Sequence, residues 1–365
     1  MAKTRVLVVL TDLHGGGAQR IVLTLLTHLP RERFDLHLAL VTRTGRMLPQ
    51  VPPDVPVHDL GVKRVRGAAL PLTRLVRALR PDVVFSTLYH LNQMVLLLRP
   101  ALPPGTRLVI REAITLSEAL RRRGSGRLSS ILLRRLYPSA DLIVCQCEFM
   151  ADDLARHFAV PRAKMATIYN PIDVEHVRSL ARAGTNPFRD RDRTRGPHLV
   201  ALGRLDPQKG FDDLIRRLPA LLASRPEAHL WFVGEDVTPG RATARALEAL
   251  VRDLRLEPRV HFTGFQPNPY PYLAHADLFV LSSRYEGLPN ALLEALALGC
   301  PVVALDRPGG TREILERAGL PHRLVPELDW RPEWFRGEGP AELEPDLAAF
   351  SLERVLEAYS EALST

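Results

Sequence analysis

The chain has 365 residues, which is enough for two domains of ordinary size. Hydrophobic residues make up 46% and charged residues 25%, a balance that is typical of a globular protein and excludes a largely disordered chain. The 49 Lys and Arg residues outnumber the 41 Asp and Glu residues, so the formal net charge of +8 favours an anionic partner.

The cysteines and the apolar runs indicate the cellular compartment of the protein. Cys145, Cys147 and Cys300 form no CxxC or Cys/His zinc spacing, which indicates a reducing compartment rather than a disulfide scaffold. The first apolar run is short and leads into a glycine-rich turn, so it is typical of a buried strand and not of a signal peptide. No stretch reaches the roughly 18 apolar residues of a membrane span, and we expect a cytoplasmic protein.

Short apolar runs alternate with helical patterns in the first half of the chain. Strands are predicted at 5–10, 36–41, 82–86, 107–110 and 141–145. Helices are predicted between them, including 17–29, 71–79 and 148–158. Continuous runs of β-branched residues and leucine are typical of parallel strands buried on both faces, so this series predicts a doubly wound sheet.

The composition of the sequence changes at residues 183–197, which are polar, charged and bounded by proline. We interpret this segment as a linker. After them the series of strands restarts at 198–202, 229–233, 259–262, 278–281 and 301–305. The predicted fold class is therefore α/β, with two Rossmann-like doubly wound parallel-sheet domains that face a central cleft.

We place the first domain at 1–182 and the second domain at 198–345. Residues 327–346 are predicted to form a loop. The last stretch predicts an amphipathic helix from 351 to 363, and we expect residues 351–365 to pack back on the first domain.

Gly15, Gly16 and Gly17 join the first predicted strand to the first predicted helix. Glycine allows close approach of the backbone to a ligand, and the N–H groups at a helix start attract anions. The pattern is not G-x-G-x-x-G, and no acidic residue follows at the spacing of an NAD site. A plain strand-to-helix turn therefore stays open as an alternative.

Two cations share the loop after the strand at 198–202, in the segment GRLDPQKGFDDLI. Arg204 and Lys209 flank a proline turn and can converge on one diphosphate. Because ligands of doubly wound sheets bind at the carboxyl ends of the strands, we favour a diphosphate site over two solvated surface charges.

The segment EGLPNALLEALALG (286–299) places two carboxylates around an apolar helix. The helix is predicted to begin at Pro289 and to end before Gly299, so Glu286 lies in the preceding loop and Glu294 lies within the helix. On one continuous helix the two carboxylates would be about 12 Å apart, beyond the roughly 5–9.5 Å of a glycosidase pair. Separate roles are therefore favoured over a paired acid and base.

Polar residues also follow the predicted strands of the first domain. His90 and Asn92 follow the third of these strands, and Arg111 and Glu112 follow the fourth. We expect all four side chains to reach the cleft from the side of the first domain. A structural role stays open for His90, because a lone histidine more often has one.

Together these segments resemble the retaining nucleotide-sugar glycosyltransferases of family 4, which have the GT-B fold. The resemblance rests on the E-x7-E motif from Glu286 to Glu294 with the GCPVV segment after it, and on GRLDPQKGFDDLI, GGGAQR and GGTREIL in the family's order. It covers nearly the whole chain, and the first domain looks most like bacterial polysaccharide enzymes. Many members carry a histidine beside the reacting sugar where this chain has Arg111 and Glu112.

The resemblance implies that the domain at 1–182 binds the acceptor and that the domain at 198–345 binds the nucleotide-sugar donor. It also implies roles for the matching residues. Glu286 would contact the donor sugar, Arg204 and Lys209 would bind its diphosphate, and Glu294 would hold the ribose hydroxyls. The further donor contacts that it implies are Gly16, Gly17, Gly264, Phe265, Gly287, Leu288, Pro289 and Asn290.

These roles imply a retaining hexosyltransferase that moves a sugar from a nucleotide-sugar, with UDP-sugars favoured, to a glycan or polyprenyl-linked acceptor in cell-surface polysaccharide biosynthesis. No metal or other cofactor is expected, because Arg204 and Lys209 can stabilise the charge of the departing nucleotide. Two alternatives are a GT-B epimerase or hydrolase of nucleotide-sugars and a non-enzymatic sensor. The first needs a different catalytic set, and the second would be expected to lose Lys209 or Glu286.

Arginine and leucine interleave in the region from Arg121 to Arg135. Residues 111–140 contain seven arginines and two glutamates, a net charge of +5. Such a surface suits anionic lipid, so we predict peripheral contact with the inner face of the plasma membrane, with a solvated arginine-rich surface as the alternative. Nucleic acid is not expected as a partner, because aromatic residues are only 6% and do not alternate with the arginines.

Overall fold

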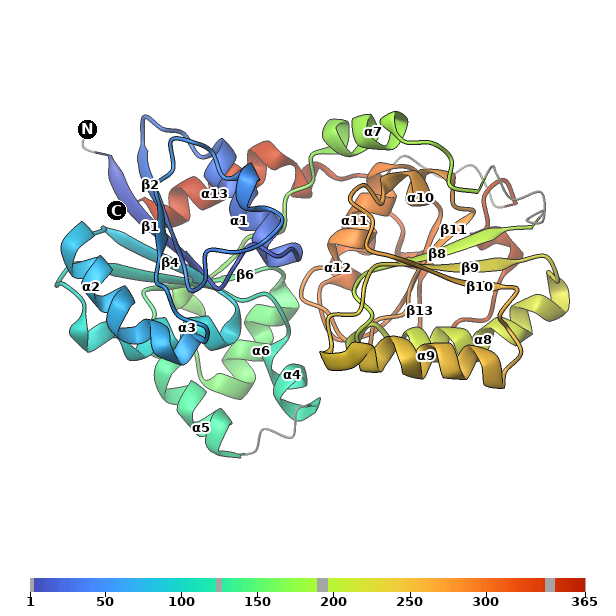
Figure 1. Cartoon of the computed structure of the whole chain (residues 1–365), viewed down its shortest axis with the longest axis horizontal. Helices are drawn as coiled ribbons and strands as arrows, with labels where there is room; N and C mark the ends of the chain where they lie inside the picture. Colours follow the sequence, from blue (N-terminus) through green and yellow to red (C-terminus); the bar gives the residue numbers. More distant parts are fainter. Residues whose placement is uncertain (1–2, 123–126, 189–195, 339–344, 365) are drawn as a thin grey trace. The chain divides into compact units, whose positions relative to one another are not determined.

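The computed structural model describes residues 3–122, 127–188, 196–338 and 345–364. The chain divides into two compact units. The first unit comprises Met1–Pro171 and Leu352–Thr365, and the second comprises Ile172–Ser351. Each unit has a parallel sheet with helices on both faces, as Figure 1 shows, and each is described here by itself.

The first unit is built on a seven-stranded parallel sheet with the order β3-β2-β1-β4-β5-β6-β7. Its strands are β1 (Thr4–Leu10), β2 (Phe34–Leu40), β3 (Val57–Asp59), β4 (Val83–Thr87), β5 (Arg107–Arg111), β6 (Leu142–Cys145) and β7 (Met165–Thr167). Its helices are α1 (Gly17–His28), α2 (Ala69–Leu79), α3 (Tyr89–Leu97), α4 (Leu116–Arg122), α5 (Arg127–Leu136), α6 (Glu148–Phe158) and α13 (Leu352–Leu363). The strand order reverses between β1 and β4, which makes the carboxyl ends of these strands a favourable place for a ligand.

Helices α1 and α13 pack against one face of this sheet, and α2 and α3 lie on the other face (Figure 1). Alternate residues of β1, among them Val6 and Val8, belong to the core under α1 and α13. On α13, Val355, Tyr359 and Leu363 recur every fourth residue and are buried in that same core. This apolar stripe fixes the C-terminal helix to the first unit.

The second unit is built on a six-stranded parallel sheet with the order β10-β9-β8-β11-β12-β13. Its strands are β8 (His198–Leu202), β9 (His229–Val233), β10 (Val260–Gly264), β11 (Leu278–Leu281), β12 (Val302–Leu305) and β13 (Leu324–Val325). Its helices are α7 (Val174–Ala183), α8 (Phe211–Ser224), α9 (Ala242–Asp253), α10 (Tyr270–His275), α11 (Asn290–Ala297) and α12 (Thr311–Arg317). Helices α8 and α9 cover one face, α10 and α11 cover the other, and the strand order reverses between β8 and β11 (Figure 1).

The doubly wound architecture predicted from the sequence is confirmed in both units. The ten predicted strands are present with ends that differ by at most a few residues. The structure adds β3, β7 and β13, which have only two or three residues each and lie at the outer edges of the sheets. Strands this short give too little periodic pattern to be recognised in a sequence.

The boundary between the units lies earlier than the sequence analysis places it. Residues 172–182 belong to the second unit instead of the first. The reason is α7, which packs on α10 and α11, and whose Arg178 donates from Nε to the carbonyl of Ala297 at 3.0 Å. Part of the predicted linker, residues 189–195, lies outside the described residues.

Residues 327–338, the described start of the predicted loop at 327–346, form a loop with one 3-10 turn at Pro332–Trp334. This loop is not a solvated surface segment, because Trp330, Trp334 and Phe335 are buried in the core of the second unit. Residues 339–344 lie outside the described residues.

Candidate functional site

The centre of the candidate site in the second unit is an ion pair between Lys209 and Glu286. Lys209 ends the 3-10 turn η6 (Pro207–Lys209) after β8, and Glu286 lies in the loop between β11 and α11. The lysine Nζ lies 2.6 Å from the Oε1 atom of Glu286, and only 17% and 9% of the two side chains are exposed. Ser283 Oγ donates to the same oxygen at 2.6 Å, and Gln208 Nε2 lies 3.4 Å from Oε2. Three donors therefore hold the carboxylate in one orientation.

Backbone hydrogen bonds connect the loop that carries Glu286 to the loops on either side of it. The Arg284 N–H donates to the carbonyl of Gln208 in the loop after β8, at 2.8 Å. The Glu286 N–H donates to the carbonyl of Pro308 in the loop after β12, at 2.9 Å. The three loops at the carboxyl ends of β8, β11 and β12 thus form one connected surface.

Two glycines allow this close approach. Gly210 has a φ of 64°, and a Cβ at this position would lie 2.3 Å from the carbonyl oxygen of Ser282. Gly309 has a φ of 130°, and a Cβ there would lie 2.4 Å from the carbonyl oxygen of Glu286. Because both contacts are with backbone and both φ angles are positive, only glycine fits without a shift of the loops.

The other predicted donor residues lie around this centre. Arg204 is exposed, and its guanidinium has no hydrogen bond or ion pair with the part of the chain that the structure describes. Glu294 is buried on α11, with the hydroxyl of Tyr270 at 3.5 Å from its Oε1 atom. Gly264 ends β10 with a φ of 71°, and the next residue, Phe265, is 43% exposed.

The start of α11 agrees with the sequence analysis to within one residue. The helix begins at Asn290, so Glu286 precedes it together with Gly287, Leu288 and Pro289, while Glu294 lies within it. The binding roles of these residues toward phosphate, sugar and ribose stay predictions.

In the first unit, the glycine-rich turn leads from β1 into α1, as predicted. Gly15 and Gly16 have φ angles of 125° and 148°, and α1 begins at Gly17 without a side-chain cap. The N–H groups of this helix start are therefore not used by a capping side chain, and the predicted contact of Gly16 and Gly17 with a phosphate stays a prediction.

The four acceptor-side candidates separate into one exposed residue and three buried ones. His90 is exposed on α3 and lines a pocket. Asn92, Arg111 and Glu112 are at most 1% exposed, so these three side chains do not reach the surface. They lie in a polar network inside the first unit, and their role toward an acceptor stays a prediction.

Glu112 is the most perturbed acid of this network. Its Oε1 atom accepts hydrogen bonds from Asn92 Nδ2 and from the Tyr137 hydroxyl, both at 2.6 Å. Its Oε2 atom is buried with no partner in the described structure. Burial raises the pKa of Glu112 to about 7, and it also raises the pKa of Tyr137.

Arg111 is fully buried beside Glu112 and links β5 to the C-terminal helix. Its Nε atom donates to the hydroxyl of Tyr359 on α13 at 3.0 Å, and one terminal nitrogen donates to Asn170 Oδ1. Its other terminal nitrogen lies 3.3 Å from Thr87 Oγ1. The guanidinium is therefore engaged on all three nitrogens, which explains why it does not reach the surface.

Several residues of the second unit contribute to the site without having been predicted. Ser283 and Gln208 orient Glu286, and Tyr270 lies beside Glu294. Arg284 bridges Asp212 at 2.8 Å and Asp213 at 2.6 Å, which fixes the start of α8. Gln208 and Ser283 stand next to predicted loop residues, but nothing in their spacing signals these contacts.

Comparisons with known proteins give one consistent result for both units. Residues 15–176 match the family described as Glycosyltransferase Family 4, and residues 196–335 match the family described as Glycosyl transferases group 1. The chain is 32% identical over 339 residues to a Campylobacter jejuni protein, with 89% of this chain and 87% of that protein covered. That protein is named N-acetylgalactosamine-N,N'-diacetylbacillosaminyl-diphospho-undecaprenol 4-alpha-N-acetylgalactosaminyltransferase.

Solved structures show the same fold at low sequence identity. Sucrose-phosphate synthase from Thermosynechococcus elongatus has a TM-score of 0.76 and 17% identity, over 99% of this chain and 98% of that one. Anabaena HepE in complex with UDP-glucose has a TM-score of 0.71 and 18% identity, over 98% of this chain and 94% of that one.

We predict that Glu112 makes stability fall as the pH rises. The unfolded chain releases this proton near its ordinary pKa of 4.5, whereas the folded chain holds it to about pH 7. The stabilisation is therefore complete below the lower value and is lost as the pH rises through the higher one, by about 3 kcal/mol. Glu112→Gln should remove this part of the pH dependence in urea unfolding between pH 5 and 8. Glu361→Gln, at an exposed position of α13, serves as the control and should keep the wild-type slope. Equal slopes for all three proteins would contradict the assignment.

We also predict that Gly309→Ala disrupts the three connected loops at the carboxyl ends of β8, β11 and β12. The new methyl group would meet the backbone of Glu286, so the loop itself has to shift. Gly319→Ala is the matched control, because Gly319 also has a positive φ of 76° but has open space around it. The control should lose only about 1–2 kcal/mol for the backbone conformation, and Gly309→Ala should lose clearly more. Thermal unfolding of the two variants measures the difference, and equal losses would show that the close contact is unimportant.

Proposed function

This chain is a member of glycosyltransferase family 4 with the GT-B fold, and we propose that it transfers a hexose from a nucleotide-sugar to a lipid-linked glycan acceptor. The observation that carries the proposal is the Lys209–Glu286 pair, which sets a cation and a fixed carboxylate side by side where the strand order reverses. The similar C. jejuni protein is named for a transfer onto a diphospho-undecaprenol-linked sugar, which supports an acceptor of this class in cell-surface polysaccharide biosynthesis.

The cations of the second unit suit a nucleoside diphosphate leaving group. An ammonium group has three N–H donors, so Lys209 can hold Glu286 and still donate to a phosphate oxygen. Arg204 is exposed and has no carboxylate partner in the described structure, so its charge is available to the same ligand. Together they would stabilise the negative charge that develops on the departing nucleotide without the need for a metal ion. A UDP-sugar is the donor to test first, because HepE, which shares this fold, binds UDP-glucose.

Glu286 would bind the hydroxyl groups of the donor sugar. A carboxylate that is oriented by Lys209, Ser283 and Gln208 still has lone pairs for sugar hydroxyls, and its position is fixed before the ligand arrives. The bond between the anomeric carbon and the phosphate oxygen would break through an oxocarbenium-like state. The acceptor oxygen would form the new bond from the same face, and its proton would pass to the released phosphate. The alpha linkage in the name of the C. jejuni relative is the outcome that retention gives from an alpha-linked donor.

A peripheral membrane contact would bring the enzyme to a lipid-linked acceptor. On α5, Ile131 and Leu132 are 49% and 44% exposed, and Arg134 and Arg135 are exposed beside them. An exposed apolar pair flanked by cations suits the headgroup region of an anionic bilayer. Among the residues that the structure describes, no helix has the length and apolar character needed to cross a bilayer. Residues 123–126 of the predicted contact region lie outside the described residues.

We predict that Lys209→Ala and Glu286→Ala each lower the turnover of a nucleotide-sugar by about 100-fold or more, the scale for loss of one preorganised charge contact. Product formation from a panel of UDP-, GDP- and ADP-sugars, measured with a lipid-linked acceptor, tests this. Arg216→Ala removes a cation from an exposed position of α8 and should retain full activity. Full activity in either site variant would refute the role assigned to it.

We predict that the protein co-sediments with vesicles that contain acidic phospholipid at low salt and dissociates at high salt. The double variant Ile131→Ser/Leu132→Ser should bind these vesicles less. Leu254→Ser removes a 37%-exposed leucine from the second unit and should bind as the wild type does. Binding that does not depend on salt, or that the double variant retains in full, would exclude α5 as the contact.

A further inference from the structure

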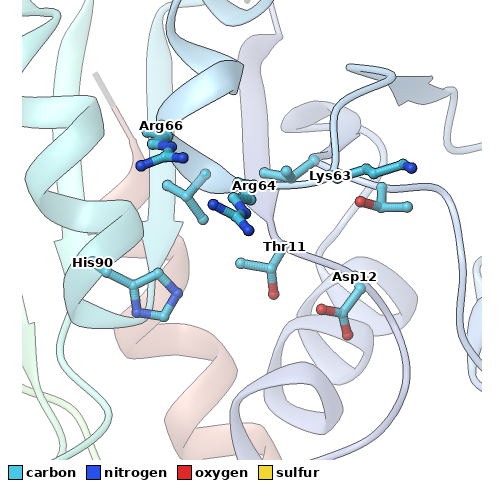
Figure 2. A pocket seen from close by; sticks show the side chains of 9 residues that line it. Thr11, Asp12, Lys63, Arg64, Arg66 and His90 are labelled. Atoms are coloured by element: carbon cyan, nitrogen blue, oxygen red, sulfur yellow. The ribbon is translucent and has the colours of Figure 1, made fainter.

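The first unit has a pocket of its own at the carboxyl edge of its sheet (Figure 2). Its volume is about 440 Å³, which is within the range of small-molecule sites. Its main polar lining consists of Thr11, Asp12, Lys63, Arg64, Arg66 and His90. Apart from His90, none of these residues was singled out in the sequence analysis.

Four separate segments of the chain meet at this pocket, one of which is Val41 and Thr42 after β2. Thr11 and Asp12 directly follow β1, while Arg64 and Arg66 follow β3 and lie at the 3-10 turn η2 (Val65–Ala68) before α2. His90 lies in the first turn of α3, directly after β4. Strands β1 and β4 are the pair at which the strand order reverses, so the pocket occupies the position where doubly wound sheets bind ligands.

The turn that places His90 contains an unusual backbone conformation. Leu88, the residue before α3, has a φ of 79°. A positive φ is strained for a bulky residue of this kind, and such conformations are found preferentially at functional sites. The strain is held by the structure around it, including the hydrogen bond from the Asn92 N–H to the Leu88 carbonyl at 2.9 Å.

The charge of the pocket is strongly positive and is not balanced by the protein. Lys63, Arg64 and Arg66 are exposed, and their side chains have no hydrogen bond or ion pair with the described residues. Among the described residues of the lining Asp12 is the only carboxylate, and it already accepts a hydrogen bond from the His14 N–H at 3.0 Å. Figure 2 shows the guanidinium of Arg64 turned toward Thr11, while the ammonium group of Lys63 points away.

We propose that this pocket binds the phosphate or diphosphate group of a ligand, with Arg64 and Arg66 as its charged contacts. Planar guanidinium groups bind phosphate oxygens through two parallel hydrogen bonds, and the Thr11 hydroxyl and the His90 ring lie in the same lining. The single carboxylate of Asp12 does not neutralise the positive charge of the lining. A ligand group with at least two negative charges does so. The identification of this group with the diphosphate of a lipid-linked acceptor rests on the proposed function, whereas the phosphate site itself does not.

The test is site-resolved arginine labelling of the full chain with phenylglyoxal, read by mass spectrometry. The probes are inorganic pyrophosphate, farnesyl diphosphate and, as an uncharged control, farnesol. Both diphosphates should slow the labelling of Arg64 and Arg66, while Arg74, an exposed residue of α2 outside the pocket, is labelled at an unchanged rate. Labelling of Arg204 reports separately on diphosphate bound in the second unit.

Variants make the test quantitative. In Arg64→Gln, the pyrophosphate concentration that half-protects Arg66 should rise about 10-fold or more, the loss expected for a hydrogen bond between charged groups. Arg74→Gln removes the same charge nearby and should leave this concentration unchanged. An equal rise in Arg74→Gln, no protection of Arg64 and Arg66 by either diphosphate, or equal protection by farnesol would each overturn the proposal.

The same experiment identifies the source of the ligand and keeps the two proposals distinct. Protection by farnesyl diphosphate at much lower concentration than by pyrophosphate indicates a lipid-linked diphosphate, and equal protection indicates a free phosphorylated ligand. Both outcomes support the phosphate site. Protection in the labelling experiment, together with no sugar transfer in the assay with the panel of nucleotide-sugars, would support the phosphate site and overturn the glycosyltransferase proposal. Transfer without protection would do the reverse.

Discussion

The ion pair between Lys209 and Glu286 is the interaction on which the candidate donor site of the second unit depends. Both side chains are largely withdrawn from water, and removing charges from water costs more than a simple pair usually returns. The additional hydrogen bonds from Ser283 and Gln208 offset part of this cost by satisfying the carboxylate. The pair therefore makes sense as a device that fixes a carboxylate in place for a ligand, and not as a source of stability.

The parallel sheet makes this pair possible. Strands β8 and β11 are neighbours in space, although 75 residues lie between the end of β8 and the start of β11 in the chain, so the loops that follow them lie in contact. The backbones approach closely because Gly210 has no side chain against Ser282, and Gly309 in the loop after β12 has none against Glu286. The site is thus specified as much by where side chains are absent as by the two charged residues.

The sequence was sufficient for those features that depend on local order along the chain. The strands that follow one another in βαβ order, the start of α11 and the placement of Glu286 before it all come from short-range patterns of apolar residues, proline and glycine. The burial of Arg111 could not be predicted in this way, because its partner Tyr359 comes from a helix more than 200 residues further along the chain. The place of Arg64 and Arg66 in a pocket could not be predicted either, because β3, the strand before them, has only three residues and gives no recognisable pattern.

Lys209 of the second unit differs in its setting from Arg64 and Arg66 of the first unit. In the second unit, Lys209 is withdrawn from solvent and paired with a carboxylate, so its position is fixed and salt has little effect on it. In the first unit, Arg64 and Arg66 are exposed and have no ion pair in the described structure, so their attraction for an anion has a longer range but is screened by salt. The difference suits two tasks within one reaction. A sugar–phosphate bond that is to be broken needs fixed charges at close range, whereas a charged group remote from the reacting atoms needs only to be captured and held.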